Sequence, residues 1–305
     1  MSLVSEVLAG SLRGGTSIVY AGTGESFSES AGVVNLGTEG SMLTGALAAY
    51  AVAYETGNVW VGVGAGALAG GALAMVHAFF VLNRRSNQLA TGLIVLFLGL
   101  GLTSLFGASY VSKDAPSIAR WAIPGLSDIP FIGPILFDQD MLTYLSIAML
   151  PVAWWLIYRS RWGLLLRGAG ERSEVLAANG HPVLLVQYLA VVGGGMLAGI
   201  GGAHLSVAYA NQWSENMVQG RGFVACAVVI FAARQPFKVA AGAWLYGGAL
   251  ALSPALQARW YGINQFALAS IPYVAIVLVL IALGKKRSAE APEGLKKVFE
   301  MAPSG

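Results

Sequence analysis

Cysteine and charged residues are scarce in this 305-residue chain, and both scarcities exclude classes of function. The single cysteine, Cys226, excludes a disulfide within the chain and a cysteine-rich metal site, and we expect no metal or cofactor here. The sequence has no Gly-x-x-x-x-Gly-Lys-Ser/Thr motif and no nucleophile motif, so we expect neither an enzyme nor a chain that hydrolyses ATP by itself. Charged residues form only 11% of the chain and the net charge is +3, which excludes the basic groove of a nucleic-acid-binding protein.

Apolar residues are abundant instead and make up 56% of the chain. Several apolar runs reach the length of about 20 residues that a helix needs to cross the hydrocarbon core of a bilayer. The sequence therefore predicts an all-α polytopic membrane protein, with about nine transmembrane helices in a permease domain of residues 1–287. A polar C-terminal tail, residues 288–305, follows the last predicted span.

The distribution of basic residues predicts how these spans are oriented. Four arginines lie in the polar loop of residues 159–182, and three basic residues follow the last apolar run at residues 285–287. Because short loops rich in arginine and lysine stay on the cytoplasmic side, we place this loop and the C-terminus inside. The segment 107–140 is rich in proline and poor in basic residues, so we place it and the N-terminus outside. A short surface helix around residues 129–135 is compatible with its proline spacing.

Within the cytoplasmic loop, residues 171–179 predict one short amphipathic helix that Gly170 opens and Gly180 closes. A helix this short is marginal in isolation, so we expect a partner protein to complete it. The apolar side chains available to that partner are Val175, Leu176 and Ala178. The residues that we expect to couple the loop to the partner are Gly170, Glu171, Glu174, Leu176, Ala177 and Gly180.

A faint internal repeat predicts two inverted halves. Residues 35–40 and 216–222 are glycine-interrupted polar segments that each precede an apolar run, and the pentapeptide of residues 70–74 recurs at residues 247–251. Paired breaks of this kind in two oppositely oriented halves indicate a translocation pathway near the membrane midplane. Glycine and alanine are common enough here that chance recurrence is the alternative. The candidate pathway residues are Asn35, Glu39, Met42, Arg221 and Phe223.

Charged and polar residues inside the apolar segments each have two interpretations. Glu39 and Arg221 occupy equivalent places in the two copies, and either they form an ion pair or each caps a helix near the lipid headgroups. Glu25 and Glu29, four residues apart on one helix face, either bind a cation or, as we favour, lie at the cytoplasmic edge. The two histidines in apolar spans, His77 and His204, we interpret as packing residues.

Three stretches closely resemble the permease subunits of bacterial ABC importers for nucleosides and simple sugars, the branched-chain amino acid/ribose-type permease family. They are residues 30–43, residues 162–171 and residues 220–223 followed by Pro236, and the likeness extends over nearly the whole chain. The resemblance implies the type II fold of the ten-helix vitamin B12 importer permeases, here without a counterpart of the first helix. The tract of residues 39–43, the outer loop of residues 124–130 and that missing helix resemble the nucleoside branch more than ribose permeases.

The resemblance also implies partners and a location. In such importers the substrate passes between two permease subunits, paralogous or identical, in the bacterial inner membrane. A cytoplasmic ATP-binding subunit would dock on the loop of residues 159–182, so ATP would bind to that partner, and an extracytoplasmic binding protein would deliver the substrate. We therefore expect the membrane subunit of an ATP-driven nucleoside importer. The alternatives are a permease for ribose or another simple sugar and, as a different class, an ion-coupled secondary transporter, which the acidic residues of the first spans would fit.

Overall fold

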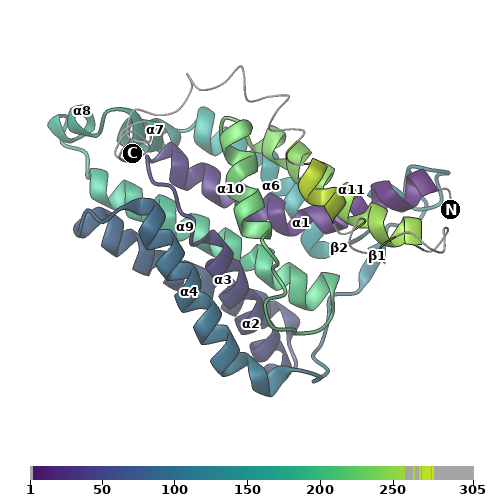
Figure 1. Cartoon of the computed structure of the whole chain (residues 1–305). Helices are drawn as coiled ribbons and strands as arrows, with labels where there is room; N and C mark the ends of the chain where they lie inside the picture. The colour runs from purple at the N-terminus through teal and green to yellow at the C-terminus, as the bar shows by residue number, and fades with distance from the viewer. Residues whose placement is uncertain (1–2, 258–263, 265–267, 269, 276, 278–305) are drawn as a thin grey trace.

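The computed structural model of the chain describes residues 3–257, 264, 268, 270–275 and 277. The last predicted span, the basic residues 285–287 and the tail 288–305 lie largely or wholly outside these residues. The regular structure is almost entirely helical, and the helices pack together in one bundle (Figure 1). The long helices are α1 (Leu3–Ser30), α2 (Thr38–Thr56), α3 (Val59–Ala78), α4 (Gln88–Gly107), α6 (Met141–Tyr158), α9 (Val183–His204) and α11 (Pro236–Gln257). The shorter helices are η1 (Phe79–Asn83), η2 (Ala108–Tyr110), α5 (Gly133–Leu136), α7 (Arg161–Glu171), α8 (Ser173–Ala178), η3 (Leu205–Tyr209) and α10 (Arg221–Phe231).

Among the residues that the structure describes, five helical segments are long and apolar enough to cross a membrane: α3 with η1, α4 with η2, α6, α9 with η3, and α11. Their outward-facing residues are large and apolar, as expected of a surface that meets lipid chains. α10 is apolar but has only 11 residues, which is too short to cross. The prediction of a polytopic helical protein is therefore confirmed, and the described helices account for part of the nine spans expected.

The two remaining long helices, α1 and α2, are shielded from the surroundings. α1 carries four charged residues along its 28, yet every residue from Gly14 to Ser26 is buried. It runs through the centre of the bundle, with α9, α10 and α11 packed against it (Figure 1). Its neighbours therefore shield this weakly apolar helix.

Small residues on α1, α3, α9 and α11 set how closely these helices approach. A Cβ built on Gly14 of α1 would lie 3.3 Å from the Cα of Gly247 of α11, and one built on Gly70 of α3 would lie 2.5 Å from the carbonyl oxygen of Gly195 of α9. Both helix pairs are antiparallel, because residues further along one helix meet earlier residues of the other. Gly70 and Gly247 are the matching glycines of the proposed repeat. Gly70 lets α3 pack closely on α9, and Gly247 lets α11 pack closely on α1.

The segment between α4 and α6 forms a small cap at one end of the bundle. Two short strands, β1 (Arg120–Ala122) and β2 (Asp138–Asp140), pair antiparallel, with Arg120 opposite Asp140. The one-turn helix α5 lies between them and corresponds to the short helix expected around residues 129–135. α7 and α8 lie at the opposite end of the bundle (Figure 1). The two ends are called the β1–β2 end and the α7–α8 end below.

Candidate functional site

The turn between α1 and α2 is held in place by a buried carboxylate of α1. The backbone N–H of Asn35 donates to Glu25 Oε1 at 2.8 Å, and the hydroxyl of Thr38 donates to Glu25 Oε2 at 3.1 Å. Asn35 Oδ1 in turn accepts the N–H of Gly37 at 3.0 Å. Polar groups that a broken helix leaves free inside an apolar bundle are costly unless they are paired, and these contacts pair them.

Glu25 and Glu29 are each only 2% exposed, so neither side chain is open to solvent, and their position at the cytoplasmic edge stays a prediction. The reason for this burial is the close approach of α9, since a Cβ built on Gly24 would lie 2.3 Å from the carbonyl oxygen of Gly194. This contact covers the last turns of α1. Glu25 acts as an internal hydrogen-bond acceptor, a role that the spacing of the two acids did not indicate.

Glu39, the second residue of α2, caps the N-terminus of α10. Its two carboxylate oxygens accept the backbone N–H groups of Gly220 at 2.7 Å and Gly222 at 2.6 Å. The first N–H groups of a helix have no partner in the helix and carry partial positive charge, so a buried carboxylate is a favourable partner for them. A Cβ built on Gly222 would lie 2.5 Å from the Cα of Glu39, and Gly220 has φ +84°. The two repeat segments therefore meet at this junction, which we call the α2–α10 junction.

Arg221 does not pair with Glu39, so the predicted ion pair between them is wrong. The guanidinium lies over the ring of Tyr209, 5.6 Å from its centroid, and Nη1 is 3.4 Å from the carbonyl oxygen of Met217. No contact of 4.0 Å or less joins the Glu39 carboxylate to the Arg221 guanidinium. The alternative interpretation, in which Glu39 caps a helix, is the correct one, although the capped helix is α10 and the cap is buried.

The remaining candidate pathway residues differ in exposure. Asn35 is 1% exposed and Met42 is 0% exposed, because α9 packs closely on this part of α2: a Cβ built on Gly202 would lie 1.8 Å from the carbonyl oxygen of Met42. Phe223, in contrast, is 36% exposed. In this conformation Asn35 and Met42 are therefore parts of the packed core, and whether they line a pathway during transport stays a prediction.

An open cavity of about 400 Å³ lies between α2 and α4, one to three turns away from the junction. Aromatic and aliphatic side chains form most of its wall, and hydroxyl groups lie among them. Its principal lining residues are Thr44, Leu47, Leu102, Thr103, Phe106 and Tyr110. Sequence reasoning missed this cavity, because a helical face that mixes Thr with Leu and Phe does not differ from an ordinary packing face.

The loop of residues 159–182 contains two helices where one was expected. Ser160 caps α7 by accepting the N–H of Gly163 at 2.9 Å, and α7 runs on to Glu171. Arg172, at φ −144° and ψ 69°, separates it from α8. The prediction that Gly170 opens the helix is wrong, because Gly170 lies inside α7, where the lack of a side chain permits close packing.

α8 lies on the surface, and only one of its apolar residues faces inward. Leu176 packs on α7, with its methyl groups 3.5 and 3.7 Å from a Cβ built on Gly168. Glu174, Val175, Ala177 and Ala178 are exposed. Gly180, at φ +78°, ends this segment as expected. An exposed helix with apolar residues is the arrangement that the sequence predicted for a partner-binding element, although Leu176 is partly buried against α7.

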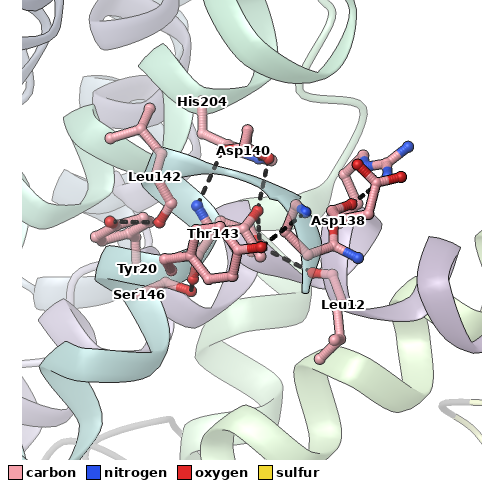
Figure 2. Close-up of polar contacts among 12 residues, drawn as sticks. Leu12, Tyr20, Asp138, Asp140, Leu142, Thr143, Ser146 and His204 are labelled. Carbon is pink, nitrogen blue, oxygen red and sulfur yellow. Dashed lines mark hydrogen bonds and ion pairs between the residues drawn. The ribbon is translucent and has the colours of Figure 1, made fainter. Parts of the chain in front are cut away.

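A second buried polar cluster lies at the β1–β2 end, where α1, α6 and α9 meet (Figure 2). Asp140 precedes α6 and accepts the N–H of Thr143 at 2.9 Å and its hydroxyl at 2.7 Å. His204 Nε2 of α9 lies 3.4 Å from Asp140 Oδ2, which is an electrostatic contact longer than an ordinary hydrogen bond. Tyr20 of α1 donates to the carbonyl oxygen of Leu142 at 2.8 Å.

Burial alone would raise the pKa of the Asp140 carboxyl, but the contacts with His204 and the two donors of Thr143 outweigh burial and hold this pKa well below its ordinary range. The cluster thus keeps a charged carboxylate inside the protein. Sequence reasoning treated His204 as a packing residue and did not identify Asp140. The available signal was the Asp-x-x-Thr pattern before an apolar run, which is typical of a helix N-cap. The other histidine, His77, has Nε2 3.1 Å from the carbonyl oxygen of Val34.

Residues 7–283 match the family described as branched-chain amino acid transport system / permease component. The chain belongs to this family. A provisionally named glucose ABC transporter permease of Haloferax volcanii is 40% identical over 85% of this chain and 79% of its own length. The nucleoside ABC transporter permease of Lactococcus lactis subsp. cremoris is 28% identical over 96% of both chains. The guanosine ABC transporter permease of Bacillus subtilis is 26% identical over 97% of both chains.

Membership of the family confirms the resemblance seen in the sequence. The chain is a multi-pass membrane permease, which is a transport subunit. The α2–α10 junction, the cavity between α2 and α4, and the helices α7 and α8 are the parts of this permease that we expect to take part in transport.

Proposed function

We propose that this permease is the membrane subunit of an ATP-driven importer and that it forms a pathway for nucleosides with a second permease, identical or paralogous. The observation that carries the proposal is the similarity to two nucleoside permeases over almost the full length of both chains. The complete subunit would have about nine spans in the type II arrangement, in two inverted halves. The meeting of the two repeat segments at Glu39 and Gly222 supports this arrangement.

The partners would bind at opposite ends of the bundle. A cytoplasmic ATP-binding subunit would dock on α8, and a substrate-binding protein would dock at the β1–β2 end. The chain would lie in the cytoplasmic (inner) membrane with the N-terminus outside and the C-terminus inside, because Arg159, Arg161, Arg167 and Arg172 all lie near the α7–α8 end. Cysteines introduced at Arg172 and Lys113 in a Cys226→Ser background would test the orientation. An impermeant thiol reagent should label position 113 and not position 172 from outside. Labelling of position 172 would reverse the proposed orientation.

The cavity between α2 and α4 supports a nucleoside as the substrate. A nucleoside has a flat base and a ring of ribose hydroxyls, so it requires apolar or aromatic walls with a few hydrogen-bonding groups. Phe106, Tyr110, Thr44 and Thr103 provide these two kinds of surface. The cavity contains no charged lining residue and is open, which favours the weak binding that release on the other side requires.

A simple sugar is the second candidate. The 40% identical relative is named for glucose, and the same hydroxyl groups in the cavity would bind a sugar. An ion-coupled carrier is less well supported, because Glu25 and Glu39 already accept hydrogen bonds from the protein itself. These hydrogen bonds use part of the acceptor capacity of the two carboxylates and so make them less available to a coupling ion.

Uptake by the reconstituted complex, with its ATPase and binding protein, tests the proposal. Uptake of labelled guanosine should require ATP, should compete with other nucleosides and should be unaffected by excess ribose or glucose. Competition by sugars alone would favour the second candidate while the importer assignment stands. Uptake that is driven by an ion gradient without ATP would overturn the importer assignment.

A further inference from the structure

The segment that connects η3 to α10 reaches a depth in the bundle that can be measured along α4. Residues 210–220 form no helix or strand (Figure 1). Near the start of this segment, Trp213 packs on Gly107, the last residue of α4, because a Cβ built on Gly107 would lie 2.7 Å from the indole nitrogen. About one turn further into α4, the Ser104 hydroxyl donates a hydrogen bond to the Glu215 carboxylate. The segment therefore begins at the end of α4 that leads to β1.

The other end of the segment lies halfway along α4. A Cβ built on Gly222 would lie 2.5 Å from the Cα of Glu39 on α2. The next residue of α2, Gly40, meets α4 at Gly99, where a built Cβ would lie 2.9 Å from the Gly40 Cα. Gly99 is the middle residue of the span that α4 forms with η2. Because the eight residues from Gly99 to Gly107 rise about 12 Å, the segment descends from the end of this span to its midpoint.

Uncharged polar side chains are exposed along this descent. Asn216 and Gln219 are both exposed, and neither amide takes part in a hydrogen bond within the part of the chain that the structure describes. Phe223 follows in the first turn of α10 and is 36% exposed. The charged residues nearby have partners already, since Glu215 is bonded to α4 and the Arg221 guanidinium lies over an aromatic ring. The surface thus presents two free amides and an aromatic ring at membrane depth.

Irregular backbone with exposed polar groups is not stable against lipid. At membrane depth it occurs where protein buries it or where it lines a water-filled cavity, and the described part of this chain leaves Asn216 and Gln219 uncovered. We propose that residues 215–223 line the aqueous pathway and that the amides of Asn216 and Gln219 bind the substrate in it.

The chemistry of this surface matches an uncharged substrate with a flat ring and many hydrogen-bonding groups. Each amide carries both donors and an acceptor, as the edge of a nucleobase and the ribose hydroxyls require. Phe223 provides a face on which a base can stack. The choice of a nucleoside rests on the proposed function, whereas the exposure of the segment to water does not.

Reaction of introduced cysteines with a charged thiol reagent tests the proposal. Asn216→Cys and Gln219→Cys are made in a Cys226→Ser background, and the assembled complex is held in lipid nanodiscs, where the reagent reaches both faces of the membrane. The matched control is Ala72→Cys on α3. Ala72 is exposed and lies at the same depth, because a methyl carbon of its neighbour Leu73 would lie 3.2 Å from a Cβ built on Gly40 or on Gly99.

Positions 216 and 219 should react at least about tenfold faster than position 72, because a charged reagent does not enter the hydrocarbon region. Equal rates at the three positions would overturn the proposal, since the segment would then be covered by lipid or by another protein chain. Guanosine should slow the reaction at position 219 about twofold at half occupancy. Protection by glucose and not by guanosine would support the pathway and overturn the nucleoside. Fast reaction without protection by either would overturn substrate binding by these amides.

Gln219→Met tests the binding role without a label. It removes the amide at nearly constant shape, so guanosine uptake should fall about three- to tenfold, the loss expected for one hydrogen bond. The Tm should stay that of the wild-type protein, because the side chain is exposed. Gln219→Asn keeps an amide and tolerates the positive φ of this residue, +52°, so it should restore most of the uptake. Wild-type uptake by Gln219→Met would overturn the role of this residue.

Discussion

Gly170 of α7 and Gly32, in the turn after α1, touch through their backbones. A Cβ built on Gly170 would lie 2.9 Å from the nitrogen of Gly32 and 2.4 Å from the carbonyl oxygen of Ser30. Gly32 leads through the turn at Asn35 to α2, whose Glu39 holds α10. A continuous set of contacts therefore joins the α7–α8 end to the α2–α10 junction. Continuity alone does not establish coupling, so it has to be tested by substitution.

We predict that Gly170→Ala uncouples ATP hydrolysis from transport. The added methyl group would push α7 away from the turn at Gly32, at a cost of about 1–3 kcal/mol for overpacking. In the assembled complex, ATP hydrolysis should persist while substrate uptake falls at least about tenfold. The matched control is Gly168→Ala in the same helix, where a Cβ would meet only the methyl groups of Leu176 at 3.5 Å or more. Normal uptake by Gly170→Ala would exclude this contact from the coupling.

A second prediction concerns the surface of α8. Ala177→Asp places a charge on an exposed face that we propose to be covered by the ATPase, so the variant should fold normally but lose the ATPase on purification and lose ATP-dependent uptake. Leu176→Asp should additionally lower the thermal stability, because Leu176 packs on α7. Ala122→Asp, at an exposed alanine at the other end of the bundle, is the control for retention of the ATPase on purification. If the ATPase still copurifies with Ala177→Asp, its docking surface lies elsewhere.

Glu39→Gln tests the cap of α10. Glutamine keeps one acceptor but loses the charge, so one N–H of Gly220 or Gly222 would lose its partner, and we expect a loss of about 1–3 kcal/mol in unfolding free energy. Arg221→Gln should cost less, since the guanidinium lies over Tyr209. In a double-mutant cycle followed by thermal unfolding in detergent, the two changes should add within about 0.5 kcal/mol. A larger coupling energy would indicate that Glu39 and Arg221 form an ion pair after all.

The sequence was sufficient for the parts of the fold that depend on apolar length and on the sign of charge. Runs of apolar residues located the spanning helices, and the arginines marked the loop that contains α7 and α8. The repeated glycines at residues 70 and 247 indicated equivalent helix contacts, because a missing side chain is visible in the sequence. Each of these features depends on the residues of a single segment and not on its contacts with distant segments.

Features that depend on a partner far along the chain could not be predicted. For Glu39 the sequence left an ion pair with Arg221 and a helix cap as alternatives, because its partners are backbone N–H groups, which every residue except proline carries and no sequence distinguishes. Gly170 was interpreted as a helix end because glycine commonly ends helices, whereas here it is required by the approach of Gly32. Met42 follows a broken segment and still lies in the core, because Gly202 of α9 packs against it.

The last prediction concerns the charge that is buried at the β1–β2 end. Asp140 lies in β2, before the first residue of the α6 span, and its partners His204 and Thr143 lower its pKa against the effect of burial. A carboxyl whose pKa is lower in the folded than in the unfolded state stabilises the protein above its unfolded pKa, about 3.9, and this contribution is lost as the pH falls from there through the folded pKa. Asp140→Asn removes the charge and should cost about 1–3 kcal/mol at pH 7.

Thermal unfolding of wild-type and Asp140→Asn proteins in detergent, measured from pH 7 downward, should therefore show a difference in Tm that persists to about pH 5 and shrinks below about pH 4. In a His204→Gln background the difference should be smaller at pH 7 and its loss should be complete at a higher pH, because one of the groups that lowers the pKa of Asp140 is then removed. If the difference in Tm instead shrinks between pH 7 and pH 5, the effect of burial on the pKa of Asp140 is larger than the effect of His204 and Thr143. The carboxyl would then be neutral at moderately acidic pH, and the cluster that joins α6 to α9 would be held by hydrogen bonds alone.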